Sequence, residues 1–410
     1  MNLKSNGIKA FLASIVPGIF LVGYNIGTGS ITTMASGGAN FGMSLLWALL
    51  LSCVFTYVMI IAFSKYTIVT KETSLHAFKT HFGKVVTIFI VLSILISETI
   101  SCVGVMGVVT QVIQEWSRPL TAEGEGFNPI VIASICCVLL YYLFWQGRNT
   151  FFEKILSVFV FVMGVCFLVT LFFVMPSVSS ILEGIIPTIP HRDNSFLIIA
   201  GMVGTTMGGV LYVVRSILVN QANWQINDMG KQKRDAVISV SLMFILSFAV
   251  MACAAGTMYP KGFHVDNAID MVRLMEPLAG HFATSLFVSG IVSAGLSSLF
   301  PIIVLGPWLI SDYLGVDRDL TKKWARGLAL FTTLCGLIVP LLGGRPIFVM
   351  ILSQSLAIVS TPMVILLMVI LLNKKELMGS YVATRCNNII YGITLLFSLI
   401  ISIIAIIGLI

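Results

Sequence analysis

The sequence predicts an all-α integral membrane protein with about eleven transmembrane helices, and three features support this. Only 10% of the 410 residues are charged, whereas a typical soluble domain has about 25%. Apolar segments recur from Phe11 to the C-terminus, and each has about the 20 residues that a helix needs to cross a bilayer. These segments are apolar on all sides, unlike the alternating strands of a membrane barrel.

The apolar segments define the expected helices, which cover residues 11–35, 43–64, 84–113, 129–146, 151–175, 195–219, 235–259, 279–310, 326–343, 347–372 and 388–409. The first of them continues past Gly23 without a small-x-small cleavage pattern, so we interpret it as a membrane span and not as a signal peptide. The cysteines show no metal-ligand spacing, and no cofactor is expected.

The basic residues predict the orientation, because cytoplasmic loops are enriched in Lys and Arg. With the N-terminus inside, eighteen of the 24 basic residues fall in cytoplasmic segments, five fall in external loops, and Arg215 lies within a helix. An odd number of spans then places the C-terminus outside. We therefore expect a multi-pass protein of a bacterial-type inner membrane, in contact with the lipid bilayer. Nucleic acid is not an expected partner, because the basic residues do not cluster on a soluble face.

Two of the expected helices contain clusters of glycine and hydroxyl residues at membrane depth. One cluster covers Gly23–Ser30 in the first helix, and the other covers Gly204–Gly209 in the sixth. Such clusters free backbone groups where a helix lines a cavity, although glycines also serve close helix packing. Breaks five helices apart are typical of transporters built from inverted repeats. We therefore expect five-helix repeats at 11–175 and 195–372, followed by an additional helix at 388–409.

Several short motifs follow one another along the chain. They are Gly38–Trp47 after the first helix, Met207 with Leu211 and Tyr212 in the sixth, Ser289–Ser298 in the eighth, Gln354 in the tenth, and Asn373–Gly379 in the next loop. In order and spacing they resemble the Nramp family of proton-coupled divalent metal ion transporters. The resemblance covers nearly the whole chain. It implies a LeuT-type fold, import of a cation and a co-transported proton.

The chain departs from the family's pattern at the positions that bind metal. The family's first helix carries Asp-Pro-Gly-Asn, whereas residues 27–30 here are Gly-Thr-Gly-Ser. Gly27 therefore stands in place of the metal-binding aspartate, and Ser30 in place of the asparagine. In the sixth helix Met207 is retained, but two glycines replace the Pro-His that follows it in the family.

The candidate substrate ligands are groups at the two breaks and in the tenth helix. They are the backbone carbonyls of Asn25 to Gly27, the hydroxyls of Thr28, Ser30, Thr205 and Thr206, the thioether of Met207, and the amide of Gln354. The Met207 thioether would favour a transition metal over calcium or magnesium. A dehydrated divalent cation normally needs anionic ligands, and this set contains no carboxylate. The sequence therefore predicts weak binding of such an ion.

Glu98 and Arg215 are the charged residues expected within the membrane, where a charge costs about 2.5–3.5 kcal/mol on insertion scales. We interpret Glu98 as a proton or cation relay, with a protonated, hydrogen-bonded carboxyl as the alternative. Arg215 either extends to the inner surface or lines the inward exit, where its charge would oppose cations. Both residues are candidates for proton or ion coupling.

Three functional interpretations stay open at this point. The first is a secondary transporter that imports a metal cation, such as hydrated magnesium or manganese, by alternating access. In the second, the same fold carries another small solute coupled to protons or sodium. The third is a membrane sensor, which the short loops favour least. An enzyme is not expected, because no nucleophile–base pair and no paired carboxylates occur at helical spacing.

Overall fold

A computed structural model describes residues 27–146, most of 161–190, 192, 194–263, 265, 270 and 276–409. Within these ranges the regular structure is helical, and no strand is present. The main helices are α3 (Thr28–Phe41), α4 (Leu46–Thr70), α5 (Ser74–Phe82), α6 (Lys84–Ser117), α7 (Pro129–Gln146), α9 (Val178–Glu183), α10 (Ser195–Met207), α11 (Gly209–Gln221), α12 (Met229–Thr257), α14 (Glu276–Leu314), α15 (Lys323–Cys335), α16 (Ile338–Leu342), α17 (Pro346–Val359), α18 (Thr361–Asn373), α19 (Lys375–Met378) and α20 (Arg385–Leu409).

Nine helical segments in the described part of the chain are long and apolar enough to cross a membrane. They are Leu46–Thr70, Lys84–Leu120, Pro129–Gln146, Ser195–Gln221, Ile226–Lys261, Val288–Leu314, Lys323–Leu342, Pro346–Asn373 and Arg385–Leu409. These segments coincide with nine of the eleven expected helices. The other two, 11–35 and 151–175, lie partly outside the described residues, so the total of eleven stays a prediction.

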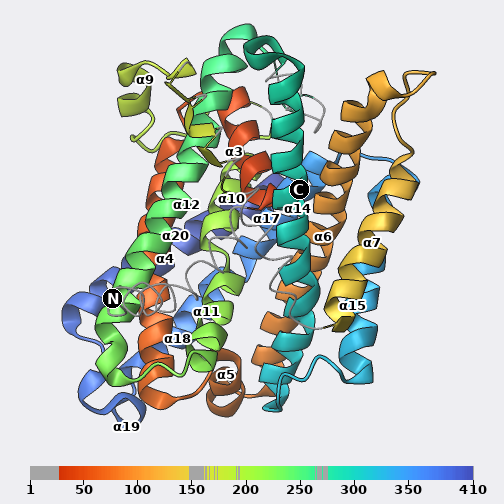
Figure 1. Ribbon diagram of the computed structural model, residues 1–410. Helices are drawn as coiled ribbons and strands as arrows, with labels where there is room; N and C mark the ends of the chain where they lie inside the picture. Colours follow the sequence, from red (N-terminus) through yellow and green to blue (C-terminus); the bar gives the residue numbers. More distant parts are fainter. Residues whose placement is uncertain are drawn as a thin grey trace, which may run out of the picture.

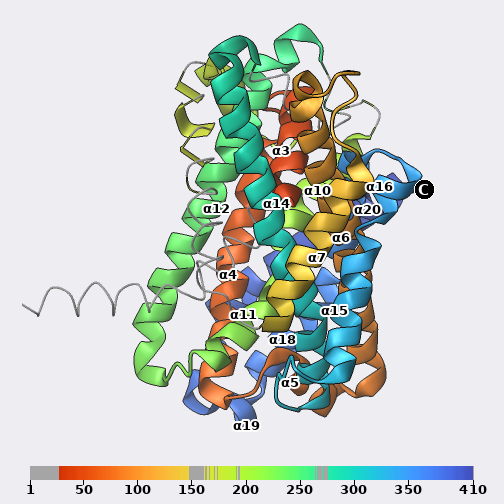
Figure 2. The ribbon, with the colours of Figure 1, turned by 45° about the vertical axis from the view of Figure 1, so that its right-hand side comes forward.

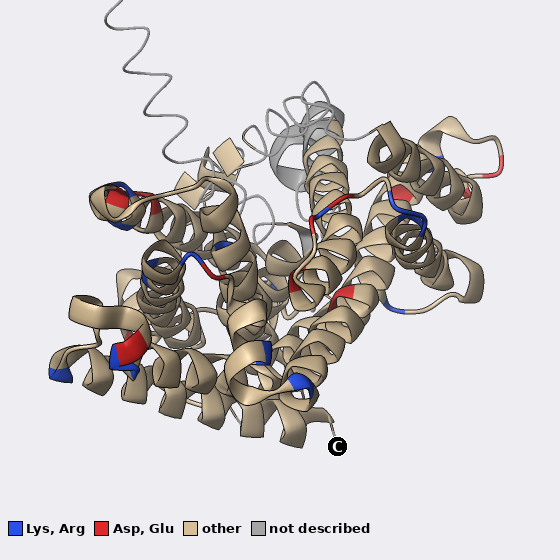
Figure 3. Cartoon of the chain, turned by 90° about the horizontal axis from the view of Figure 1, so that it is seen from below, with Lys and Arg blue, Asp and Glu red and all other residues tan. Residues whose placement is uncertain are grey.

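The spans pack side by side with their connecting segments at two opposite ends (Figure 1). The short helices α5 and α19 lie at the lower end of the view, and α9 lies at the upper end. Charged residues occupy only short stretches of the ribbon, as the view from below shows (Figure 3). Helices with few charged residues suit the apolar interior of a bilayer.

The predicted break in the sixth helix is confirmed. Helix α10 ends at Met207, Gly208 has extended backbone angles (φ −59°, ψ 139°), and α11 starts at Gly209. In the first helix, α3 starts at Thr28 after Gly27, whose backbone is also extended (φ −66°, ψ −174°). This start agrees with a break there, and the residues before Gly27 lie outside the described part of the chain.

The tenth helix is also interrupted, which was not predicted. Helix α17 ends at Val359 and α18 starts at Thr361, although 347–372 was expected to be one helix. Pro362 supplies the reason, because its ring nitrogen cannot donate the hydrogen bond that would continue the helix. Ser360 between the two helices keeps near-helical angles (φ −83°, ψ −13°), so the interruption is milder than the break at Gly208.

The interior of the bundle depends on small residues where helices touch. Helix α17 packs against both α6 and α10, and α12 packs against α3 and α4. A Cβ atom on Gly204 of α10 would lie 1.9 Å from the backbone oxygen of Gln354 in α17. Gly204 therefore allows these two helices to approach closely, as glycines in membrane helices commonly do. Helices α7 and α15 lie together at the side of the bundle in both ribbon views (Figures 1 and 2).

Candidate cation site

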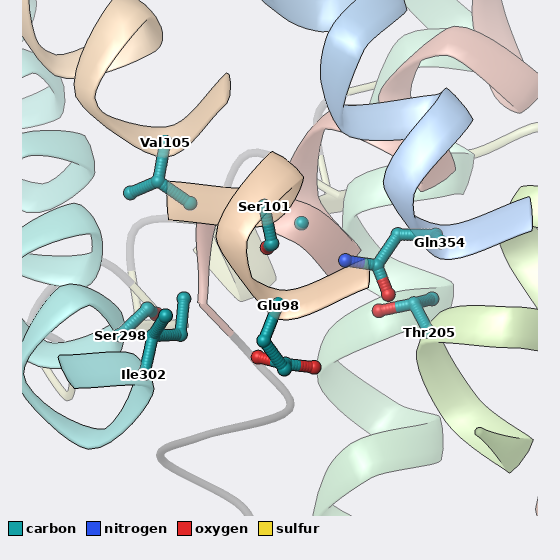
Figure 4. A pocket seen from close by; sticks show the side chains of 8 residues that line it. Glu98, Ser101, Val105, Thr205, Ser298, Ile302 and Gln354 are labelled. Atoms are coloured by element: carbon teal, nitrogen blue, oxygen red, sulfur yellow. The ribbon is translucent and has the colours of Figure 1, made fainter. Parts of the chain in front are cut away.

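A small cavity of about 30 Å³ lies where five helices meet. Its volume is enough for roughly one or two water molecules or a small ion. The lining residues are Gly29 of α3, Glu98, Ser101 and Val105 of α6, Thr205 of α10, Ser298 and Ile302 of α14, and Gln354 of α17 (Figure 4). The cavity is therefore built from both expected repeats and lies beside the break in the sixth helix.

Helix α6 supplies the charged group of the cavity. Glu98, Ser101 and Val105 are three and seven residues apart, which places them on one face of the helix. The Glu98 side chain is only 7% exposed. In Figure 4 it lies between the Ser298–Ile302 side of the cavity and the side formed by Gln354 and Thr205. A buried carboxylate thus faces a small space that is otherwise lined by neutral groups.

Thr205 and Gln354 form the opposite polar wall. The close approach of α10 and α17 at Gly204 brings the next residue, Thr205, beside Gln354 (Figure 4). The amide nitrogen of Gln354 lies 3.5 Å from the Ser353 hydroxyl, and in Figure 4 the amide points toward the Glu98 side of the cavity. Three hydroxyl groups, one amide and one carboxyl group therefore line one space.

The structure places Glu98, which was expected as a coupling residue, beside two of the predicted substrate ligands, and the ligand set itself stays a prediction. Glu98 lines the same cavity as Thr205 and Gln354, because α6 packs against α17 and places its Glu98 face toward α10. The other cavity residues Ser101, Val105, Ser298 and Ile302 were not among the predicted site residues. A local signal was present for Ser101, because it follows Glu98 by one helical turn.

Other predicted ligands point elsewhere. The Ser30 hydroxyl lies 3.0 Å from that of Ser247 in α12, and the Thr206 hydroxyl donates to Ser52 of α4 over 2.6 Å. Met207 is completely buried. Neither these three residues nor Gly27 line the cavity, so their role as ligands stays a prediction. Asn25 and the Thr28 side chain lie outside the described part of the structure.

Arg215 does not extend to the inner surface, and that alternative is wrong. Its side chain is fully buried in an ion pair with Asp235 of α12. Its Nε donates to the Ser64 hydroxyl over 2.7 Å, and the guanidinium lies 5.3 Å from the centre of the Trp224 ring. Asp235 compensates the positive charge, so the expected opposition to cations loses its basis. A coupling role for Arg215 stays a prediction, since Arg215 does not line the cavity.

An interrupted helix beside a central polar cavity, in a bundle of membrane-spanning helices, defines the class of LeuT-type transporters. The fold resembles the crystal structure of the manganese transporter of Eremococcus coleocola, mutant H236A, with a TM-score of 0.76 and 16% identity over 98% of this chain and 86% of that one. It also resembles the crystal structure of MhsT in complex with L-phenylalanine, with a TM-score of 0.56 and 14% identity over 96% of this chain and 97% of that one.

The chain belongs to the Nramp family: the model of natural resistance-associated macrophage protein-like sequences matches residues 18–408. The divalent metal cation transporter MntH of Klebsiella pneumoniae (strain 342) is 25% identical over 383 residues, which are 92% of this chain and 89% of that protein. MntH of Deinococcus radiodurans is 23% identical over 395 residues, or 94% and 87% of the two chains. The predicted resemblance is thus confirmed, and the family consists of transporters and not of enzymes.

Proposed function

We propose that this protein is a secondary transporter that imports a divalent metal cation by alternating access, with the cavity at Glu98 as its binding site. The main support is one observation, a buried carboxylate in a cavity that hydroxyl and amide groups from three other helices also line. A carboxylate in such a place offsets part of the hydration that a cation loses. The relatives named as divalent metal cation transporters support the same class of substrate.

The ligand chemistry favours magnesium, with manganese as the second candidate. Among the described residues that line the cavity, the donor groups are one carboxylate, three hydroxyls and one amide, without a thioether. Oxygen ligands of this kind suit magnesium, calcium and manganese. Calcium takes six to eight oxygen ligands, whereas magnesium usually keeps several waters and needs few protein groups. Magnesium therefore needs fewer protein oxygens from this donor set than calcium does, and a cavity of about 30 Å³ leaves room for the ion with roughly one water.

A different small solute is the alternative function. The structural likeness to MhsT extends to the fold alone, and it offers no support for an amino-acid substrate. Pockets for organic ligands usually measure about 300–1,000 Å³. The cavity of about 30 Å³ is far smaller than that. A cation is therefore better supported than a solute of amino-acid size, and membership of a transporter family argues against a sensor.

Purified protein in liposomes tests this function. Magnesium uptake should be measured with a trapped fluorescent indicator, beside manganese uptake and a panel of radiolabelled amino acids. We expect saturable magnesium uptake, competition by manganese and no amino-acid uptake. Uptake of an amino acid without uptake of either cation would instead show that the protein carries a different small solute.

For the orientation we propose a cytoplasmic N-terminus in a bacterial-type inner membrane. The basic residues Lys375 in α19, Lys374 directly before it and Lys79 in α5 lie in segments at the same end of the bundle (Figure 1). Cytoplasmic ends are enriched in such residues. A reporter inserted at Lys231–Arg234 should be cytoplasmic, and one fused after Ile410 should be external. Both reporters on one side would exclude this topology.

A large side chain at Gly29 should fill the cavity and strongly reduce transport. A Cβ atom at this position would lie 3.0 Å from both the Gln354 amide nitrogen and the terminal carbon of Met350. A leucine would therefore occupy the space assigned to the cation. We expect Gly29→Leu to lower magnesium uptake at least tenfold while the protein still inserts into the membrane. Gly327→Leu in α15 is the matched control, because a Cβ atom there meets nothing within 4 Å. Normal uptake by Gly29→Leu would remove this residue from the site.

A further inference from the structure

The break between α10 and α11 leaves backbone groups without partners in their own helices. A helix end has carbonyl and N–H groups that no residue of the same helix can pair. Within a bilayer water does not replace these partners, so unpaired groups cost several kcal/mol each. In inverted-repeat transporters the free groups at such breaks often bind the transported ions. The groups in question are the Thr206 carbonyl at the end of α10 and the Gly209 N–H at the start of α11. Each could contact a substrate only if no other residue already pairs with it.

The carbonyl at the end of α10 is paired with a side chain of α4. The Thr56 hydroxyl donates to the Thr206 backbone oxygen over 2.7 Å. Thr56 is fully buried, and its oxygen also lies 3.3 Å from the Tyr212 hydroxyl. Since the single Thr56 proton is directed at Thr206, Tyr212 must be the donor in the second bond. A chain of hydrogen bonds thus runs from Tyr212 in α11 through Thr56 to Thr206 in α10, across the break.

The amide at the start of α11 is paired with a side chain of α18. The Gly209 N–H donates to the Thr361 hydroxyl oxygen over 2.8 Å. Thr361 is fully buried, and its hydroxyl proton goes to the carbonyl of Ala357 over 3.0 Å. The direction of the bond to Gly209 is therefore fixed. Gly209 is also tightly packed, because a Cβ atom there would lie 3.2 Å from the Val364 Cγ2.

Thr361 connects the two interrupted helices of the second repeat. It is the first residue of α18, directly after the interruption of the tenth helix. Gln354, which lines the cavity, lies seven residues earlier in α17, or two helical turns along the same segment. The tenth helix therefore contributes Gln354 to the cavity and Thr361 to the break. Thr205, another cavity residue, directly precedes Thr206, whose carbonyl Thr56 holds.

We propose that Thr56 and Thr361 are positioning residues of the transport site, an inference that rests on the proposed function. They hold the two ends of the break, and they fix the direction in which Thr205 faces the cavity. Thr56 also occupies the Thr206 carbonyl, the one of these two backbone groups that could bind a cation, so the cation is bound by side chains and not by this carbonyl. Neither residue touches the substrate.

Isosteric substitutions test this proposal. Thr361→Val and Thr56→Val keep the side-chain volume and remove the hydroxyl, whereas Thr361→Ser and Thr56→Ser keep the hydroxyl. Thr394→Val in α20 is the matched control, because Thr394 is also fully buried and its hydroxyl bonds to the Ile390 carbonyl of its own helix. Two properties should be measured on folded protein: hydrogen exchange of the amides of residues 205–212, and the KM and turnover of magnesium uptake.

We expect both valine variants to exchange faster over residues 205–212 than the wild type and to raise the KM for magnesium roughly tenfold. The serine variants should restore both properties, and Thr394→Val should leave both unchanged. Wild-type exchange and KM in the valine variants would overturn the proposal, as would an equal change in Thr394→Val. If the wild type carries no magnesium, the proposed function fails, and exchange alone then decides whether these residues hold the break.

Discussion

Glu98→Gln is expected to weaken magnesium binding by at least tenfold. Glu98 is the carboxylate among the described residues that line the cavity, and it is only 7% exposed. Two unit charges about 4 Å apart attract by about 4 kcal/mol at an effective dielectric constant of 20, and a divalent cation doubles that attraction. Desolvation offsets much of the gain, but about 1.4 kcal/mol is enough for a tenfold change in affinity. Calorimetry with magnesium on both proteins measures the difference.

The same substitution should flatten the pH dependence of transport, because glutamine cannot take up or release a proton. Glu98→Asp keeps the charge and should retain part of the affinity. Glu115→Gln is the matched control on the same helix, since Glu115 pairs with Arg118 at 2.7 Å and does not line the cavity. If Glu98→Gln has wild-type affinity and a wild-type pH profile, Glu98 is a structural residue and the cation binds elsewhere.

Arg215→Met is expected to destabilise the protein by about 3–5 kcal/mol. Arg215 and Asp235 are both completely buried, and removing the arginine leaves the aspartate charge uncompensated inside the bundle. The same change also removes the bond from Arg215 to the Ser64 hydroxyl. Thermal unfolding of the purified protein in detergent, followed by its helical signal, measures the loss.

The double variant Arg215→Met with Asp235→Asn separates the effect of charge from that of packing. It contains neither buried charge, so it should recover most of the stability that the single variant loses. Arg118→Met is the matched control. The Arg118 side chain, which pairs with Glu115, is 44% exposed, and exposed ion pairs contribute only about 0–1 kcal/mol to the stability of the folded protein. A double variant as unstable as Arg215→Met would show that the guanidinium acts through its packing on Trp224 and not through its charge.

The positions of the spans could be predicted from the sequence because a helix in a bilayer must satisfy its own backbone hydrogen bonds. Each long apolar segment therefore has one viable structure, and nine expected helices coincide with observed spans. The break at Gly208 could also be predicted, because adjacent glycines at membrane depth weaken a helix. Pro362 is a similar local signal for the interruption of the tenth helix, which the sequence analysis did not use.

The composition of the cavity could not be predicted because it depends on contacts between distant helices. Glu98 joins the site only because α6 packs against α17, and no local pattern in the sequence encodes that contact. Thr205 and Gln354 were predicted from the break and from the family resemblance. Thr206 was predicted on the same grounds, but the next position along a helix points about 100° away, and its hydroxyl bonds to Ser52.

The ion pair of Arg215 and Asp235 was not predicted, although the sequence contained a signal for it. The residues are only twenty positions apart, at the facing ends of α11 and α12, which follow one another in the chain. Opposite charges at such positions could have been paired from the sequence, because consecutive helices are usually adjacent in space. Treating Arg215 by itself led instead to the expectation that its charge opposes cations.

Anomalous diffraction from crystals soaked with manganese tests the central claim most directly, because manganese accepts oxygen ligands and scatters strongly at its absorption edge. We predict an anomalous peak inside the cavity, between the Glu98 carboxylate and the side chains of Thr205 and Gln354. The same peak should be absent in Glu98→Gln crystals. A peak in the wild type beside Met207 and Gly27, away from Glu98, would contradict the account and place the cation at the break.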